Sequence, residues 1–377
     1  MAYAQGKRGF WLIQNRVVIL ADFDYFFAQC EELRNPTIKD KPVVVGVYSG
    51  RTEESGAVST SNYIARKYGV KSGMPLFLAK HKLEGTDAVF FKVDHEYYDL
   101  ISDRIMEIFR GYTSSFEQVS VDEAYLDVTE QVECSFEKAR EYAQKIKADV
   151  ENQVGISFSI GVGPNKLVAK IACDSQKPNG LTIVKPKEAE AFLAPLEVDR
   201  LLGVGKKTMV RMEQMGIKTI GDLAKYHCPR LIEVFGKALG IYFHNAANAI
   251  DNEPVLEQGE AESISRIGTL KQDTRDLAFI LQKTDELTEY VFKDLTERNL
   301  SFKLVSIYVV MVDLSSKTRS ITLDQPSKDR ETISRNVKNL FEKFLSESTL
   351  EIRRVGVKIS GFQKEEPHQR PLTLFFQ

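Results

Sequence analysis

The segment that decides the fold reads Ser120-Val121-Asp122-Glu123-Ala124-Tyr125-Leu126-Asp127, an apolar, strand-like run that holds two adjacent carboxylates. Charges buried in such a run need a partner, usually a metal ion or another cation. In a regular strand, Asp122 and Glu123 would point to opposite faces, so both reach one site only if a turn or bulge falls there. The run alone also allows a second interpretation, in which Glu123 and Asp127 face solvent and Asp122 forms a turn.

A second run, residues 17–27, repeats this arrangement. Its apolar part has the length of a strand, ends in Asp22 and leads into an aromatic cluster. Together the two runs offer Asp22, Asp122 and Glu123 at strand ends. Hard divalent cations prefer carboxylate and backbone oxygens as ligands. The two runs therefore predict a site for a pair of such cations.

Composition restricts the class of protein. The chain has 377 residues, of which 43% are hydrophobic, so it is long enough for more than one core. No run reaches the roughly 18 consecutive apolar residues of a membrane span, and the start lacks the pattern of a signal peptide, so we expect a cytoplasmic protein. The four cysteines lie far apart, which argues against a disulfide framework and a zinc site. The net charge of −2 does not indicate a nucleic-acid partner.

Hydrophobic spacing predicts the elements of a first core unit. They are a strand over 16–22, a mixed segment to about 91, a helix over 97–111, the acidic strand run over 117–128, a helix near 135–152, a strand over 154–162 and a helix over 167–173. This order indicates a sheet with helices on one face, of the split βαβ type. The acidic residues would then share one surface of the sheet.

Residues 185–250 read as a compact helical region. Within it, Gly203-Val204-Gly205-Lys206 leads into a helix, and backbone N–H groups at such a helix start can hold a phosphate without reading sequence. The pattern resembles a helix-hairpin-helix, which grips the DNA backbone, and residues 235–238 form a weaker second example. A tight turn between helices is the alternative interpretation.

Residues 251–262 are polar and acidic and read as a linker. Beyond them, residues 263–362 alternate strand, helix, strand, strand, helix, strand, which predicts a second, smaller α+β unit. Its predicted strands carry basic residues that would suit a surface laid along phosphates, namely Arg266, Lys271, Lys317, Arg319, Arg353, Arg354 and Lys358. Solvated strand faces are the alternative.

Six motifs carry a resemblance to a known family. They are Asp22-Phe23-Asp24-Tyr25-Phe26-Phe27, Ser59-Thr60-Ser61-Asn62-Tyr63-Ile64-Ala65-Arg66, Ser120-Val121-Asp122-Glu123-Ala124-Tyr125, Gly163-Pro164-Asn165-Lys166, Lys177-Pro178-Asn179-Gly180 and Gly203-Val204-Gly205. Through them, residues 17–362 resemble the Y-family, lesion-bypass DNA polymerases of the archaeal and bacterial DNA polymerase IV type. The resemblance implies a template-directed DNA polymerase of low fidelity that performs translesion synthesis.

The resemblance also implies an α+β, multidomain right-hand architecture. Its parts would be an N-terminal extension (1–15), a ferredoxin-like palm (16–25 and 92–184), fingers (26–91), a helical thumb with the helix-hairpin-helix (185–250), a linker (251–262), a little finger (263–362) and a tail (363–377). Primer–template DNA and a deoxynucleoside triphosphate (dNTP) would be the partners, and the chain would act as a monomer.

The family's residue roles carry over to matching positions. Asp22, Asp122 and Glu123, with the carbonyl of Phe23, would hold two Mg²⁺ ions. The nucleotide would contact Tyr25, Phe26, Phe27, Thr60, Tyr63, Arg66 and Lys177, with Phe27 as the steric gate against a ribose 2′-hydroxyl. The templating base would lie under Val47, Ala57 and Ser59. DNA would contact Gly203, Gly205, Lys206, Arg266, Lys271, Arg319 and Arg353.

The tail has a pattern of its own. Gln369, Leu372, Phe375 and Phe376 follow at i, i+3, i+6 and i+7, so that a short helical turn would gather them on one side. This resembles the peptide by which replication proteins dock on the sliding clamp. An untethered terminus is the alternative, although two exposed phenylalanines suit water poorly.

Two rival functions share parts of this pattern. A nucleotidyl cyclase can share the acidic strand pair, but its signature loop is not seen, and the hairpin region and basic C-terminal unit would have no purpose in it. A non-catalytic scaffold that binds DNA and the clamp would be expected to lack a metal ligand, whereas Asp22, Asp122 and Glu123 are all present.

Overall fold

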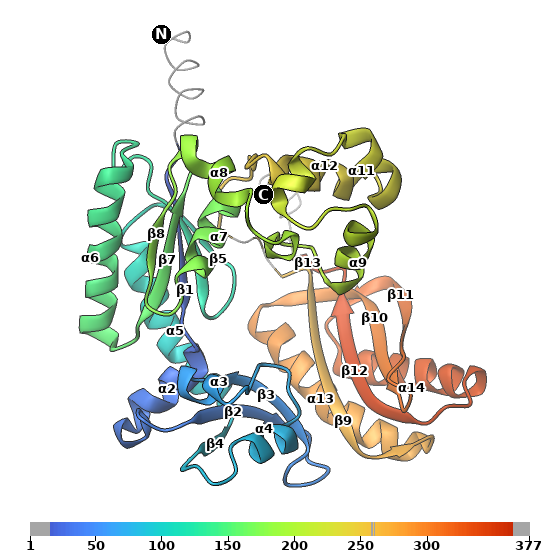
Figure 1. Ribbon diagram of the computed structural model, residues 1–377. Coiled ribbons are helices and arrows are strands. Elements are labelled where there is room, and N and C mark those ends of the chain that lie inside the picture. The colour runs from blue at the N-terminus through green and yellow to red at the C-terminus, as the bar shows by residue number, and fades with distance from the viewer. Residues whose placement is uncertain (1–15, 258, 260, 365–377) are drawn as a thin grey trace, which may run out of the picture. The chain divides into compact units, whose positions relative to one another are not determined.

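The computed structural model describes residues 16–257, 259 and 261–364 (Figure 1). These residues form two compact units, which are treated separately. The first comprises 16–46, 58–72 and 82–257, and the second comprises 47–57, 73–81, 259 and 261–364. In the described part of the chain, no helix is both long and apolar enough to cross a membrane. All four cysteines are free, as their spacing predicts.

A five-stranded sheet forms the core of the first unit, in the order β5-β6-β1-β7-β8. The strands are β1 (Val18–Phe23), β5 (Ser115–Gln118), β6 (Glu123–Asp127), β7 (Phe158–Gly163) and β8 (Leu181–Ile183). The central strand, β1, is buried along its whole length and pairs antiparallel with both β6 and β7. The predicted strand over 117–128 is therefore two strands, because a hairpin turn divides it.

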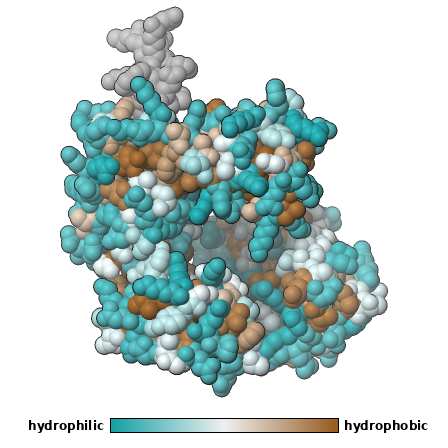
Figure 2. Space-filling view, viewed as in Figure 1, coloured by the Kyte–Doolittle hydropathy of each residue, from teal (hydrophilic) through white to brown (hydrophobic). Residues whose placement is uncertain are grey.

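Helices cover both faces of this sheet (Figure 1), so the prediction of helices on one face is wrong. Helices α5 (His95–Arg110) and α6 (Phe136–Val154) pack on the face that carries Ile19 and Ala21. The outer side of α6 is hydrophilic in Figure 2, as its exposed charged residues require. Helix α7 (Lys166–Ser175) packs on the opposite face, where Ala169 and Cys173 meet Val18 and Leu20. Since side chains alternate along a strand, Asp22 lies on the same face as α7.

Gly161 on β7 allows α7 to approach the sheet closely. A β carbon on Gly161 would lie 2.0 Å from the carbonyl oxygen of Ala169, which real β carbons do not do.

We expect Gly161→Ala to lower the free energy of unfolding by about 1–3 kcal/mol, because helix α7 would have to move. Urea denaturation measures this. The control Gly259→Ala, at an exposed position with no atom within 4 Å of the new carbon, should change the free energy little, and an equal loss in both variants would contradict the close-packing argument.

The remaining elements before residue 257 are short. A three-stranded sheet in the order β3-β2-β4 and three helices lie between β1 and α5. They are α2 (Phe26–Arg34), β2 (Val43–Tyr48), β3 (Gly56–Ser61), α3 (Tyr63–Lys67), α4 (Leu76–Lys82) and β4 (Val89–Lys92), with a 3-10 turn η1 (Pro36–Ile38). The helical region predicted over 185–250 contains η2 (Pro186–Glu188), α8 (Ala189–Leu193), η3 (Val198–Arg200), α9 (Lys206–Gln214), α10 (Ile220–Ala224), α11 (Cys228–Phe235) and α12 (Lys237–Ala247).

Both glycine turns predicted in this helical region lie between helical elements. Gly203, with φ +83°, stands in the turn between η3 and α9, and Gly236, with φ +82°, joins α11 to α12. A residue with a β carbon would be strained at either angle.

The start of the predicted linker is anchored to the first unit. Residues 251–257 form no helix or strand, yet Val255 is buried against Val18 and Leu20. The Asp251 carboxylate accepts a hydrogen bond from the backbone N–H of Leu167 at 3.0 Å. This part of the linker is therefore fixed on the α7 side of the sheet.

The second unit contains the α+β arrangement predicted for 263–362. Its sheet has the order β11-β10-β12-β9, and two helices pack against one face. The elements are β9 (Ser263–Thr274), α13 (Leu277–Glu297), β10 (Leu300–Met311), β11 (Ser316–Ser327), α14 (Arg330–Glu347), β12 (Ile352–Ser360) and the short β13 (Gln363–Lys364), which pairs with β10. The order strand, helix, strand, strand, helix, strand is confirmed.

Candidate active site

The acidic residues meet at one end of the five-stranded sheet. Asp122 lies in the turn between β5 and β6, and Glu123 is the first residue of β6, so the predicted turn at this point is confirmed. Glu123 stands directly opposite Asp22 in the strand pairing. The N–H of Phe23 donates to the carbonyl of Asp122 at 2.8 Å. The alternative interpretation is right that Asp122 lies in a turn, but Glu123 and Asp127 do not face solvent freely, since their side chains are only 19% and 20% exposed.

Two lysines form ion pairs with Asp22 and Glu123. Lys170, on α7, places its Nζ 2.9 Å from Asp22 and 3.2 Å from Glu123. Lys177 places its Nζ 2.6 Å from the same oxygen of Asp22. Both lysines also pair with Asp174, at 3.8 Å and 3.0 Å.

The three acids have the oxygen ligands that suit a divalent cation, but their carboxylates are bound to other groups and do not converge on one point. The Asp122 carboxylate accepts a hydrogen bond from the hydroxyl of Ser120 at 2.5 Å, while the lysines hold Asp22. Among residues 16–257, 259 and 261–364, no three acidic, histidine or cysteine side chains lie in positions that could hold a metal ion. The donors are nevertheless the carboxylate oxygens that hard cations prefer, and ammonium groups supply the positive charge between them.

Burial and charge shift the pKa values at this site. Burial raises the pKa of Glu123, while Lys170 acts in the opposite direction. Burial alone would lower the pKa of Lys170, but Asp22 and Glu123 raise it above its ordinary value, and the same balance, with Asp22 and Asp174, raises the pKa of Lys177. Both ammonium groups are therefore firmly charged at neutral pH.

Asp24 ties the end of β1 to the loop that carries Lys177. Its buried carboxylate accepts hydrogen bonds from the N–H of Asn179 at 2.7 Å and the hydroxyl of Ser159 at 3.0 Å. Burial raises the pKa of Asp24, and these hydrogen bonds oppose the shift. Asp24 therefore positions Lys177 relative to β1.

A pocket of about 430 Å³ opens beside the acids. It is lined by residues from β1, α2, β3, α3, the β5–β6 turn and the Lys177 loop, namely Asp22, Phe23, Asp24, Tyr25, Phe26, Phe27, Ser59, Thr60, Tyr63, Arg66, Ser72, Val121, Asp122 and Lys177. Most of the residues predicted to contact metal or nucleotide thus surround one pocket. Glu123 is not in the lining but is joined to it through Lys170.

Helix α3 presents Tyr63 and Arg66 from its first turns. The buried Asn62 caps the helix by accepting a hydrogen bond from the N–H of Ala65 at 3.0 Å. The guanidinium of Arg66 lies over the Tyr63 ring, 4.6 Å from its centroid, and donates to the carbonyl of Ser61. The Arg66 cation thus favours an anion at this wall.

The aromatic cluster forms another wall. Tyr25 has a left-handed backbone conformation, with φ 40°, and its ring meets that of Tyr63 edge to face at 5.4 Å. The half-buried Phe27 stacks on Tyr98, with centroids 4.5 Å apart, and the Tyr98 hydroxyl donates to Glu31 at 2.7 Å. The Phe27 ring is therefore held from behind.

Two residues predicted to roof the templating base are not part of this pocket. Val47 and Ala57 belong to the second unit, whereas Ser59 lines the pocket of the first. Conversely, the sequence prediction missed Lys170 and Asp174. Asp174 follows Lys170 by four residues, so the two share one side of α7, whereas Lys177 lies beyond the end of this helix.

The residues predicted to contact DNA differ in their surroundings. Gly203, Gly205 and Lys206 are exposed at the start of α9. In the second unit, Arg266 pairs with Asp294 at 2.6 Å and Arg319 with Glu347 at 3.0 Å, on the helix-covered face of the sheet.

The open face of that sheet carries other cations. Arg353 pairs with Asp273 at 2.9 Å, and Lys271 is exposed. Arg354 and Lys358 are exposed on β12 and alternate with Val355, Val357 and Ile359 of the core. They therefore point away from the helices.

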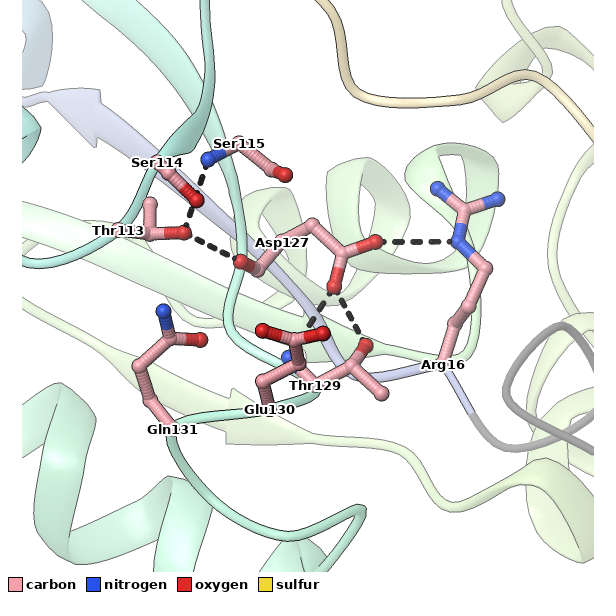
Figure 3. A pocket seen from close by; sticks show the side chains of 8 residues that line it. All are labelled: Arg16, Thr113, Ser114, Ser115, Asp127, Thr129, Glu130 and Gln131. Atoms are coloured by element: carbon pink, nitrogen blue, oxygen red, sulfur yellow. Dashed lines mark hydrogen bonds and ion pairs between the residues drawn. The ribbon is translucent and has the colours of Figure 1, made fainter. Parts of the chain in front are cut away.

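A second pocket lies at the opposite end of β1 and β6 (Figure 3). Asp127 is at its centre and accepts hydrogen bonds from the Arg16 guanidinium at 3.3 Å and from the Thr129 backbone at 3.1 Å. The Thr113 hydroxyl donates to the Asp127 carbonyl at 2.7 Å. These contacts join strand ends within the fold.

The four clamp-peptide residues, Gln369, Leu372, Phe375 and Phe376, lie outside the described residues, as does the extension over 1–15.

Comparison with known proteins places this chain in a family. Residues 21–174 match the model of the impB/mucB/samB family, residues 261–372 match the C-terminal domain of that family, and residues 199–251 match the thumb domain of DNA polymerase-iota. The chain is 44% identical to DNA polymerase IV of Nitrosopumilus maritimus, over 97% of this chain and 100% of the relative. It is 43% identical to DNA polymerase IV of Methanosarcina acetivorans, over 94% and 98%.

Solved structures agree with this assignment. A Y-family DNA polymerase chimera, Dbh-Dpo4(243-245)-Dbh, aligns with a TM-score of 0.87 and 35% identity, over 93% of this chain and 100% of the chimera. An insertion ternary complex of Dbh DNA polymerase aligns with a TM-score of 0.66, also at 35% identity and with the same coverage. The chain therefore belongs to the impB/mucB/samB family, as a DNA-directed DNA polymerase of the Y-family, DNA polymerase IV type.

Proposed function

We propose that the pocket beside Asp22 is where this translesion DNA polymerase joins a dNTP to the 3′-hydroxyl of a primer paired with its template. One observation carries the proposal. Asp22, Asp122 and Glu123 meet at the end of the sheet, beside a pocket that also gathers Tyr63, Arg66 and Lys177. Members of this family need a divalent metal ion, and the acids are the residues suited to hold it.

The proposed metal ligands are the carboxylates of Asp22, Asp122 and Glu123 and the carbonyl of Phe23. Two Mg²⁺ ions held there would lower the pKa of the primer hydroxyl and neutralise the triphosphate and the leaving pyrophosphate. By holding these ions, the carboxylates would orient the attacking oxygen relative to the α-phosphate. Such alignment accounts for much of the catalysis of phosphoryl transfer.

The cationic wall would hold the triphosphate. Lys177 and Arg66 supply fixed positive charge, and the hydroxyls of Thr60 and Tyr63 supply neutral donors. Asp24 keeps the Lys177 loop in place through Asn179. Tyr25 and Phe26 also line the pocket, and Phe27 would lie against the sugar of the nucleotide.

Contacts with the template follow from the exposed groups. We propose that Val47, Ala57 and Ser59 cover the templating base, and that Gly203, Gly205 and Lys206 hold a backbone phosphate. In the second unit, Arg266 and Arg319 already pair with carboxylates, whereas Arg354 and Lys358 lie exposed on the open face of the sheet. Arg353 likewise pairs with Asp273. We therefore propose that Arg354 and Lys358 join Lys271 in the DNA contacts, and that Arg266, Arg319 and Arg353 would have to leave their carboxylates to reach a phosphate.

Primer extension tests this function directly. With Mg²⁺, the protein should extend a primer on an intact template and on one with an abasic site. Excess EDTA should abolish both reactions, because without metal ions the negative carboxylates repel the triphosphate. Gel analysis of the products measures both reactions. A folded protein that binds the primer–template but extends neither would favour the non-catalytic scaffold. The action as a monomer and the cytoplasmic location stay predictions.

The tail provides a separate prediction. Deletion of residues 369–377 should leave extension by the isolated protein unchanged but abolish stimulation by a sliding clamp, since Gln369, Leu372, Phe375 and Phe376 would form the docking peptide. Product lengths with and without the clamp measure this. Equal stimulation of the full and shortened chains would contradict the assignment.

A further inference from the structure

Lys170 has no part in the site as proposed so far, although it contacts the site's acids directly. Its Nζ lies 2.9 Å from Asp22 and 3.2 Å from Glu123, and so joins carboxylates from two neighbouring strands. Its side chain is 25% exposed. Lys177 reaches only one of these two acids, Asp22.

We propose that Lys170 is the resident counter-ion of the metal site, and that its ammonium group competes with the first divalent cation for Asp22 and Glu123. This inference rests on the proposed metal site. In that case, a divalent cation binds only when it displaces the ammonium group. Lys170 stays protonated throughout, so the effect is one of charge competition.

The backbone fixes Lys170 in this position. Helix α7 lies against β7 at Gly161, where a β carbon would meet the Ala169 carbonyl, and Ala169 and Cys173 are buried against β1. The start of the Lys170 side chain therefore cannot move away from the sheet. Only the flexible end of the side chain can respond to a metal ion.

Asp174 gives the displaced ammonium group a second partner. It lies one helical turn after Lys170, 3.8 Å from its Nζ, and its side chain is 38% exposed. Rotation of the lysine towards Asp174 would open the space between Asp22 and Glu123 without leaving a buried charge unpaired. The site can therefore exchange one cation for another at modest cost.

The balance of charge gives the expected effect. Asp22, Asp122 and Glu123 repel one another, and Lys170 and Lys177 offset that repulsion when no metal ion is bound. The same positive charges weaken the attraction for a divalent cation. Loss of Lys170 should therefore strengthen metal binding and destabilise the metal-free protein.

Mn²⁺ binding to the full chain, without DNA or nucleotide, tests the proposal. Electron paramagnetic resonance should report Mn²⁺ affinity roughly tenfold tighter for Lys170→Met than for the wild type, because a cation close to the site is removed. Lys166→Met is the matched control. Lys166 lies one turn earlier on α7 and pairs with Glu117 at 2.8 Å, away from the pocket, so its substitution should leave Mn²⁺ affinity unchanged.

Thermal unfolding provides the second measurement. In EDTA, the melting temperature of Lys170→Met should fall below that of the wild type, and saturating Mn²⁺ should remove the difference. An equal fall with and without Mn²⁺, together with unchanged Mn²⁺ affinity, would mean that Lys170 only packs, and would overturn the proposal. If Lys170→Met does not fold, the variant Lys170→Gln, which removes the same charge, takes its place in both measurements.

Glu123→Gln separates failure of this inference from failure of the proposed metal site. Weaker Mn²⁺ binding by Glu123→Gln with no change in Lys170→Met would overturn the role of Lys170 alone. No change in either variant would overturn the metal site itself. Tighter binding by Lys170→Met and weaker binding by Glu123→Gln would support both.

Discussion

The substitution Glu123→Gln is expected to lower kcat for single-nucleotide incorporation by about 10³-fold. Glutamine keeps the volume of the side chain but removes its charge and one metal-ligand oxygen. Glu123 is the first residue of β6, faces Asp22 across the strand pair and is only 19% exposed. Little solvent can therefore replace the lost carboxylate.

The fold should tolerate this change. Lys170 keeps Asp22 as a partner at 2.9 Å, so no buried ammonium group is left unpaired. Primer–template affinity, measured by fluorescence anisotropy, should match that of the wild type. Rapid-quench incorporation of one nucleotide measures kcat.

Glu117→Gln is a matched control for this loss. Glu117 lies on β5, next to β6. It pairs at 2.8 Å with Lys166, which lies on α7, the helix that also carries Lys170. It does not line the pocket. We expect kcat within about twofold of the wild type, since the ion pair that is lost lies outside the pocket. A comparable fall in both variants would attribute the loss to the sheet and α7, and would contradict a special role for Glu123.

Much of the fold could be predicted from periodicity, whereas the layer arrangement could not. The continuous apolar run of strand length in residues 17–21 and the helical spacing in 97–111 identify a strand and a helix without tertiary information. Helix α7 is different, because it is buried on several sides. Ala169 and Cys173 pack on the sheet, while Leu167 and Ile171 pack in the core of the helical region over 184–247. A short, mostly apolar helix carries no mark of which face of the sheet it covers.

The candidate site also contains residues that the sequence identifies and residues that only the tertiary structure brings to it. Asp22, Asp122 and Glu123 stand out because carboxylates are unusual in apolar strands. Lys170 does not, since a lysine on a helix usually faces solvent. Only the position of α7, set by Gly161, brings it to the acids. Val255 shows the same limit, because a single apolar residue in a polar linker gives no sign of burial.

Phe27→Ala is expected to reduce discrimination against ribonucleoside triphosphates by about 10²-fold. A steric gate works only when the ring cannot move aside, and the structure gives the reason why this ring is held. Phe27 stacks on Tyr98, whose hydroxyl is bound to the buried Glu31, so the space behind the ring is filled by a fixed neighbour. A ribose 2′-hydroxyl that meets the front of the ring would therefore clash. Removal of the Phe27 ring would leave room for the 2′-hydroxyl in the volume that the ring now fills.

The ratio of kcat/KM for a dNTP to that for the matching ribonucleotide measures the gate. Phe27→Tyr keeps the ring and should keep the discrimination, which separates loss of the ring from disturbance of α2. Tyr98→Phe keeps the stacked platform and loses only the hydrogen bond to Glu31, so it should weaken discrimination much less than Phe27→Ala. Unchanged sugar selection in Phe27→Ala, with the fold intact by circular dichroism, would show that Phe27 only packs on Tyr98 and that another part of the pocket excludes the 2′-hydroxyl.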